Sequence, residues 1–110
     1  AMFCNDAALA ASVAEIGDGT DDPVWRMPLH DGYNHMLDST IADLVNCAPS
    51  PYAGAITAAL FLERFVADTP WMHFDIMAFN IRNRPAHPEG GEAMALRAVF
   101  EHLERSYAHK

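Results

Sequence analysis

The segment Trp71 to Asn80 sets a histidine and an acid two positions apart in an otherwise apolar run. On an extended strand, side chains two residues apart point to the same face, so we expect His73 and Asp75 to lie side by side. Such a pair suits a metal site, a catalytic dyad or a buried hydrogen bond. A zinc or manganese site needs three or four converging ligands, and no third ligand is evident nearby. The sequence therefore favours a structural pair.

Other reactive side chains give weaker signals. Cys47 and Ser50 precede an apolar segment, but no histidine follows at the spacing of a nucleophile motif. Arg82 and Arg84 suit a carboxylate site or a solvated loop, and the solvated interpretation is favoured. The glycines of segment 87–92 resemble a phosphate-binding turn, yet its two glutamates would repel a phosphate, so a tight turn is favoured.

Length and charge restrict the class of protein. The 110 residues fit one small unit, 1–110, or a piece of a larger domain. With 7 basic against 15 acidic residues, the net charge of -8 would repel nucleic acid and anionic membranes, so we expect neither as a partner. The longest apolar run, 53–62, is too short to cross a bilayer, and we see no export signal. We therefore expect a cytoplasmic protein.

Proline and glycine divide the chain into short elements. The expected elements are a helix over 5–16, an extended segment over 21–29, a short helix over 30–39, a strand over 40–48, a buried helix over 53–68, a strand over 71–77 and a helix from about Glu89. Strand, helix and strand over 40–77 predict a parallel β-α-β unit. The fold class is therefore α/β, with a partial mixed sheet flanked by helices.

The first and last helices have the clearest boundary signals. Asn5 or Asp6 is a plausible cap for the first helix, and Gly17 and Gly19 are expected to stop it. The last helix carries one apolar stripe, formed by Leu96, Val99, Phe100, Leu103 and Tyr107. Its expected dipole partners are Glu89 and Glu92 at the positive end and Arg105, His109 and Lys110 at the negative end.

Four segments, taken together, carry a family resemblance. In chain order they are DPVWRMPL, STIADLVNCAPSPYAGAITAALFLERFV, WMHFDIMAFN and RPAHPEGGEAMALRAVFEHLE. They resemble, in the right order over nearly the whole chain, the C-terminal part of the leucyl aminopeptidase family, the two-metal peptidases of the cytosol-aminopeptidase type. In better-known members Ala-Gly follows the isoleucine of the third segment, whereas Met77 and Ala78 follow it here. This departure, with RPAHPEGGE, resembles a less studied bacterial branch.

The resemblance implies an enzyme that removes N-terminal amino acids from peptide substrates. It implies a three-layer α/β/α catalytic domain, a homo-oligomer of six subunits, and two divalent metal ions, Mn or Zn, as cofactors that polarise the scissile carbonyl and activate water. The family's ligand segment, Asn-Thr-Asp-Ala-Glu-Gly-Arg, is absent here, and Lys110 is the sole lysine. We expect these groups in a missing N-terminal part of the same protein, so this chain alone should be inactive and hold no metal.

The residues that carry over from the family are those that shape substrate pockets. Met77 and Asn80 match positions that line the pocket for the N-terminal side chain, and Cys47 or its neighbour matches the wall of the next pocket. Met77 stands in place of a small alanine, which implies a shallower pocket, while Asn80 adds polarity. The resemblance thus implies a side-chain preference that differs from leucine. His73 and Asp75 match a family strand in which they are not metal ligands.

Two alternatives remain open at this point. The chain could be a non-catalytic assembly or interaction module that kept the fold segment and lost catalysis. It could also be an independent metallohydrolase that uses His73 and Asp75. A ligand segment upstream of residue 1 favours the enzyme, a nearby start codon favours the module, and a stoichiometric metal lost on His73→Ala favours the metallohydrolase.

Overall fold

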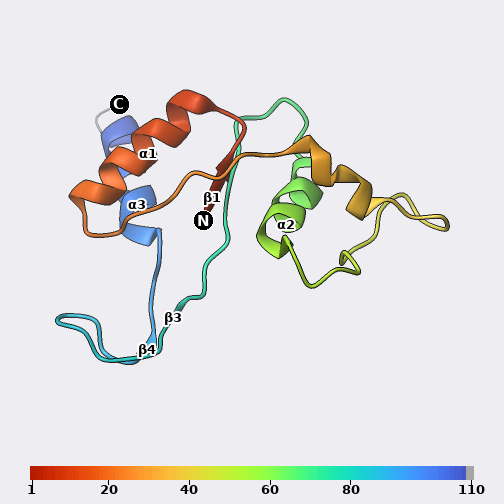
Figure 1. Ribbon diagram of the computed structural model, residues 1–110. Helices are drawn as coiled ribbons and strands as arrows, with labels where there is room; N and C mark the ends of the chain where they lie inside the picture. The colour runs from red at the N-terminus through yellow and green to blue at the C-terminus, as the bar shows by residue number, and fades with distance from the viewer. Residues whose placement is uncertain (109–110) are drawn as a thin grey trace.

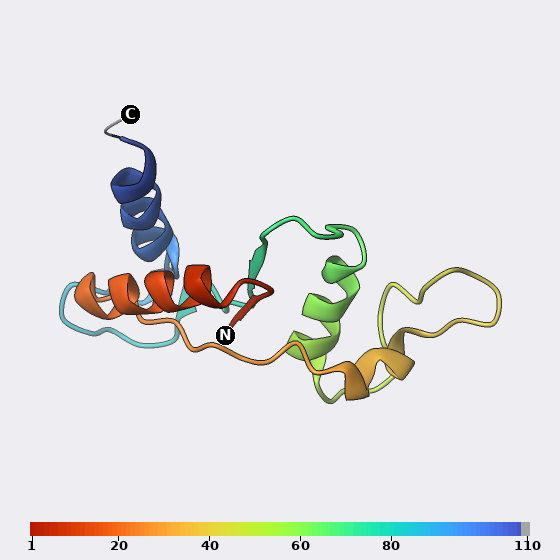
Figure 2. The same ribbon diagram turned by 90° about the horizontal axis from the view of Figure 1, so that it is seen from above.

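The computed structural model describes residues 1–108 and arranges its helices around a short strand. The elements are β1 (Met2–Cys4), α1 (Ala7–Gly19), the 3-10 helix η1 (Asp31–Leu37), α2 (Gly54–Glu63), β2 (Met72–Phe74), β3 (Phe79–Asn80), β4 (Gly90–Gly91) and α3 (Leu96–Tyr107). Helices α1 and α3 lie at one end of the molecule and η1 and α2 at the other, with β1 between them (Figure 1). The loop 38–53 extends outward from η1 (Figure 2). His109 and Lys110, expected beside the helix end, lie outside the described residues.

Strand β1 is the centre of a small mixed sheet. Its Met2 lies opposite Phe74 of β2 in an antiparallel pair. On the other edge, the Met2 amide donates to the Trp25 carbonyl at 2.7 Å and the Met27 amide donates to the Met2 carbonyl at 2.8 Å, which forms a parallel bridge. All three residues of β1 are buried, as expected of a strand that is covered on both faces. The α/β class with a partial mixed sheet is confirmed.

The strand predicted over 40–48 does not form, so the parallel β-α-β unit is absent from the described residues. This segment is an irregular loop in which Ile41 is 96% exposed. Without a neighbouring strand its backbone has no ladder partner, and a lone strand is not stable in water. The strand predicted over 71–77 does form, but β2 covers only Met72–Phe74. Its partner is β1 and not a strand over 40–48.

Helix α1 confirms the predicted cap and corrects the predicted stop. The Asp6 carboxylate accepts the Leu9 amide at 2.9 Å, which satisfies one free donor of the first turn. The helix continues through Gly17 to Gly19. A side chain at Gly17 would place its Cβ 2.7 Å from the carbonyl oxygen of Asp22. Gly17 therefore allows the chain after α1 to pass close to the helix, rather than ending it.

Helix α3 begins at Leu96, seven residues after the predicted start at Glu89. Ala95 adopts a left-handed conformation, with φ 64°, and Gly90 and Gly91 are in β4. The helix packs on α1 through its small residue Ala98, which is fully buried. Most of the predicted apolar stripe points away from this contact, with Leu96, Phe100 and Leu103 exposed at 59%, 60% and 49%.

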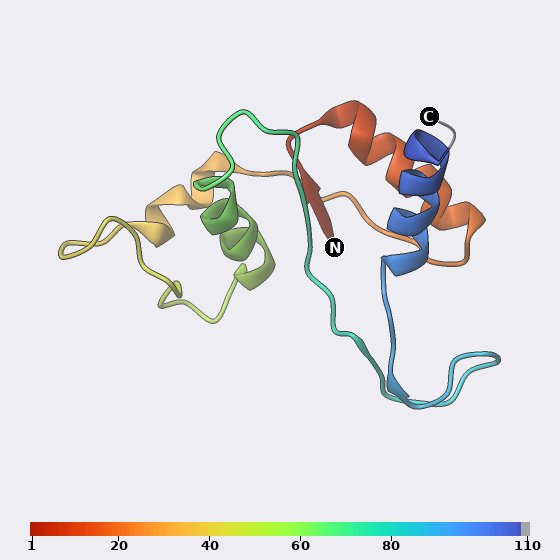
Figure 3. The same cartoon turned by 180° about the vertical axis from the view of Figure 1, so that it is seen from behind.

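The described chain is more open than a self-contained domain of its size. Its radius of gyration is 16.1 Å, against about 13 Å for a compact chain of this length. Its accessible surface is 7624 Å², about 1,600 Å² above the value for a compact protein of 12.1 kDa. Figure 3 shows the two helical ends and the β3–β4 hairpin spread around β1. Apolar area that a complete core would cover is therefore left in solvent.

We expect the isolated 110-residue polypeptide to self-associate, because its exposed apolar side chains and short sheet edges gain free energy when covered. Light scattering over a concentration series measures this, and the mean mass should rise with concentration. A monodisperse monomer at high concentration would count against the expectation.

We expect Gly17→Ala to destabilise the fold by about 1–3 kcal/mol, since the new methyl group overlaps backbone atoms that cannot move freely. Gly19→Ala is the matched control in the same helix: its Cβ meets nothing within 4 Å, so its effect should be neutral or stabilising by up to about 1 kcal/mol. Urea unfolding of both variants checks the difference. Equal stabilities would contradict the close packing at Gly17.

Candidate functional site

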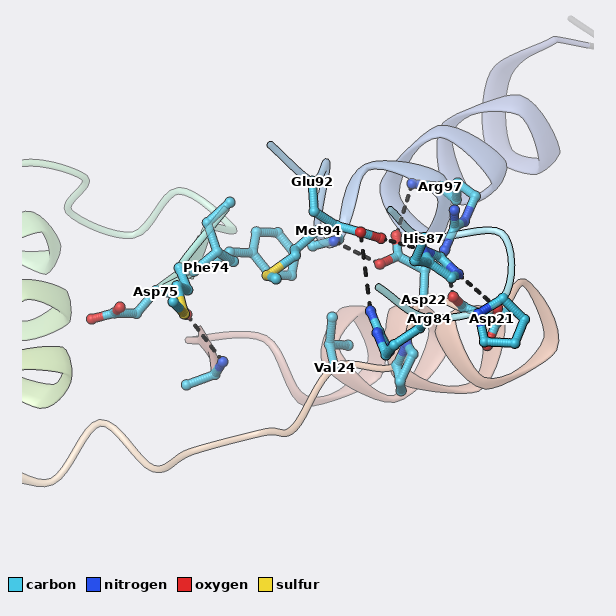
Figure 4. A pocket seen from close by; sticks show the side chains of 16 residues that line it. Asp21, Asp22, Val24, Phe74, Asp75, Arg84, His87, Glu92, Met94 and Arg97 are labelled. Atoms are coloured by element: carbon cyan, nitrogen blue, oxygen red, sulfur yellow. Dashed lines mark hydrogen bonds and ion pairs between the residues drawn. The ribbon is translucent and has the colours of Figure 1, made fainter. Parts of the chain in front are cut away.

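An open depression of about 650 Å³ lies between the end of β2 and the start of α3. This volume falls within the usual range of small-molecule sites, about 300–1,000 Å³. Its apolar wall is formed by Val24, Phe74, Ile76, Met77 and Met94. Its charged wall is formed by Asp21, Asp22, Arg84, His87, Glu92 and Arg97. Figure 4 shows Asp21, Asp22, Arg84, His87 and Arg97 gathered near the start of α3, with Phe74 and Asp75 at the opposite end of the depression.

The Asp22 carboxylate organises the base of the charged wall. Asp22 is 6% exposed, and its two oxygens accept the backbone amides of Ala95 at 2.8 Å, Arg97 at 2.8 Å and Ala98 at 3.2 Å. Ala95 has no side chain that could cap α3, so Asp22 supplies this cap from more than seventy residues away. The negative charge also complements the positive end of the helix dipole.

Arg97 connects the same two elements in the opposite direction. Its Nε donates to the carbonyl of Thr20 at 3.2 Å, and its terminal nitrogen donates to the carbonyl of Asp21. These carbonyls follow the last turn of α1, where partial negative charge favours a cation. The end of α1 and the start of α3 therefore hold one another through Asp22 and Arg97, which fixes one side of the depression.

A second polar cluster secures the β3–β4 hairpin. Asn80 is 5% exposed; its amide donates to the Pro88 carbonyl at 3.2 Å and also to the Glu92 carboxylate. Its Oδ1 accepts a hydrogen bond from Arg84 Nη2 at 2.9 Å. The same Arg84 nitrogen lies 4.0 Å from Glu92 Oε2. Every polar atom of the Asn80 side chain therefore has a partner within the hairpin.

His87 joins this cluster to the segment after α1. Its Nδ1 lies 2.5 Å from Glu92 Oε1, and its Nε2 lies 3.4 Å from Asp21 Oδ2. The side chains of His87 and Glu92 are 16% and 11% exposed, whereas that of Asp21 is 89% exposed. The contact with Glu92 is therefore the shielded and stronger of the two.

The predicted pocket residues are divided between two places. Met77 lines the depression and is 63% exposed. Asn80 lies behind the charged wall, bound to Glu92, and is not one of the lining residues. Cys47 is exposed and lines a second depression of about 340 Å³ beside α2, whereas Cys4 is buried.

His73 and Asp75 are not paired through their side chains. The imidazole of His73 stacks against Phe3 and Trp71, with ring centroids 6.2 and 6.3 Å apart, and its Nε2 is buried without a hydrogen-bond partner. Asp75 lies beyond the end of β2, and its backbone exchanges hydrogen bonds with Ala1. The expected common strand face stops at Phe74, and no hydrogen bond joins the two side chains.

Within residues 1–108, no three side chains of His, Cys, Asp or Glu converge as metal ligands would. Over the same stretch, no helix has the length and apolar character needed to span a bilayer.

Comparisons with known proteins agree with this architecture. The model of the cytosol aminopeptidase family, catalytic domain, matches residues 1–100. A probable cytosol aminopeptidase of Geobacter sulfurreducens is 41% identical over 102 residues, which cover 91% of this chain and 20% of the relative. The crystal structure of the cytosol aminopeptidase from Coxiella burnetii superposes with a TM-score of 0.89 at 52% identity, covering 96% of this chain and 23% of that one.

A more distant structure superposes as well. The bottromycin maturation enzyme BotP, in complex with Mn, has a TM-score of 0.88 at 35% identity and is covered over 24% of its length. The chain thus spans about a fifth of the length of the relatives it matches. Fold and comparisons together define a segment of a peptidase catalytic domain. The chain belongs to the cytosol aminopeptidase family.

We expect Asp22→Ala to lower the free energy of unfolding by about 2 kcal/mol or more, because it removes the cap of α3 and leaves buried amides without acceptors. Asp18→Ala, at an exposed position of α1, is the control and should change stability by less than about 0.5 kcal/mol. Urea unfolding measures both. A loss no larger than that of the control would refute the capping role.

Proposed function

We propose that the protein containing this chain is a two-metal aminopeptidase that removes N-terminal residues from peptides. In this proposal the chain supplies a wall of the substrate pocket and part of the scaffold. The metal ligands and the catalytic groups come from residues outside it, because the described residues hold no suitable cluster. The family match over residues 1–100 is the observation that carries the proposal.

The open shape supports the idea of a partial domain. The surface of this chain exceeds that of a compact chain by about 1,600 Å², which is about twice the area that each partner contributes to a standard protein interface. The chain also spans about a fifth of its relatives. We infer that the exposed side of α3 and the outer side of α2 pack against the remainder of the same catalytic domain. The alternative, a free-standing assembly module, would use these faces to bind a different protein.

The depression beside β2 is the proposed pocket for the N-terminal side chain of the peptide. Met77 contributes a long, flexible and apolar side chain to it. Asn80 is bound within the hairpin, so we propose that it acts on the pocket by holding the wall rather than by touching substrate. Cys47, in the second depression, is proposed to lie near the next residue of the peptide.

The remaining parts of the proposal come from the relatives. BotP is described in complex with Mn, and we propose two divalent ions, Mn or Zn, for the complete protein. The relatives are called cytosol aminopeptidases, which supports a cytoplasmic location. A homo-oligomer of six subunits is proposed from the family resemblance, and nucleic acid and membranes are not expected partners for a chain of net charge -8.

Kinetics of the complete, metal-loaded protein on a panel of aminoacyl anilides test this function. We expect release of N-terminal amino acids, with Met77→Ala raising kcat/KM for leucine relative to alanine by about tenfold, since removing a long side chain deepens an apolar pocket. Ile41→Ala, a truncation of an exposed residue in the loop 38–53 that lines neither depression, is the control for general loss of apolar area.

The ratio of leucine to alanine kcat/KM in wild type and the Met77→Ala variant decides the role of Met77. An unchanged ratio would remove Met77 from the pocket. A complete protein that hydrolyses no member of the panel with Mn or Zn would overturn the proposed function itself.

A further inference from the structure

We propose that Glu92 is a positioning residue that fixes the Met77–Asn80 segment, and that His87 holds Glu92 in place for this task. The proposal rests on the proposed function, because Met77 is taken to contact the substrate side chain. Glu92 itself is not required to touch the reacting atoms.

Glu92 contacts Ala78 and Asn80, the residues before and after Phe79. Its backbone amide donates to the Ala78 carbonyl at 3.0 Å, and its carboxylate accepts from the Asn80 amide. Ala78 has a φ of 54°, a left-handed conformation that costs free energy in a residue other than glycine. Such a conformation persists only where neighbouring contacts hold it, and the bond from Glu92 is one of these contacts.

The hairpin has little other stabilisation. Its strands β3 and β4 are two residues each, and a two-stranded ribbon of this length is marginal in water. One strand consists of glycines, with Gly90 at φ 128°, so no side-chain pair across the ladder adds stability. Polar contacts of Glu92, shielded at 11% exposure, must therefore supply much of the order in this segment.

His87 gives Glu92 a fixed orientation. Oε1 of Glu92 lies 2.5 Å from His87 Nδ1, while Oε2 is used by Asn80 and lies 4.0 Å from Arg84. Both carboxylate oxygens are thus occupied by different partners. A carboxylate held at both oxygens cannot rotate without losing a contact, so the Asn80 amide is aligned by the His87 side chain through Glu92.

The test uses the complete, metal-loaded protein and measures substrate selectivity. We expect Glu92→Ala to change the ratio of leucine to alanine kcat/KM by about tenfold, mainly through KM, because displacement of Met77 alters the pocket. Glu92→Gln keeps an oxygen for the Asn80 amide and should restore the ratio to within about threefold. A purely structural role would lower the active fraction and leave the ratio unchanged.

Glu101→Ala is the matched control, since it removes an exposed Glu–Arg pair, with Arg105 at 2.8 Å, from α3. It should leave the ratio unchanged. If Glu92→Ala does not fold, His87→Ala removes the contact that holds Glu92 and should shift the ratio in the same direction by a smaller factor. A ratio within twofold of wild type in every folded variant at Glu92 and His87 would overturn the proposal.

Trypsin cleavage after Arg82 separates this proposal from the proposed function. Arg84 precedes Pro85 and resists trypsin, so Arg82 reports on the hairpin. If the wild-type protein proves inactive, the proposed function fails, and cleavage then decides the positioning role. Cleavage at least about fivefold faster in Glu92→Ala than in Glu101→Ala supports it, because a released loop is a better protease substrate. Equal rates would overturn it.

Discussion

The buried carboxylate of Asp22 is the interaction on which the rest of this structure depends. It lies directly after α1, whose Gly17 allows the close approach, and it accepts three amides at the start of α3. A buried charge is costly unless it is fully hydrogen-bonded, and the free amides of a helix N-terminus meet that condition. Without this contact, α3 would have no cap and the charged side of the depression would have no fixed base.

From this base the wall of the depression is assembled in two layers. Arg97 returns the contact from α3 to the carbonyls of Thr20 and Asp21. The hairpin is then attached through His87, which lies between Asp21 and Glu92. The apolar wall, including Met77, is continuous with the sheet built on β1. The apolar core of a chain of this size is small, so apolar burial alone could not keep this wall in order. The polar network supplies the additional stabilisation.

Local signals in the sequence predicted local structure well. The Asp6 cap follows from the capping residue, and the short helix over 30–39 follows from helical periodicity. The helix predicted over 53–68 forms from Gly54 but ends at Glu63, five residues before its predicted end. The prediction of a strand over 40–48 was wrong, because a strand forms only beside a partner strand. The residue pattern of one segment does not show whether such a partner exists. The sequence also did not indicate which side of α3 packs against α1. The small residue Ala98 faces α1, whereas the large residues that dominate the periodic pattern lie in solvent. The hydrogen bonds that join the end of α1 to α3 and to the hairpin link residues 66 to 77 positions apart, so no spacing motif indicates them.

We propose that these residues form a wall of a catalytic centre whose reacting groups lie elsewhere in the polypeptide. Hydrolysis of aminoacyl anilides by the purified 110-residue chain, in the presence of manganese and beside the complete protein, tests it most directly. We expect turnover by the complete protein and none by the chain alone. Turnover by the chain alone, free of contaminating peptidase, would contradict it.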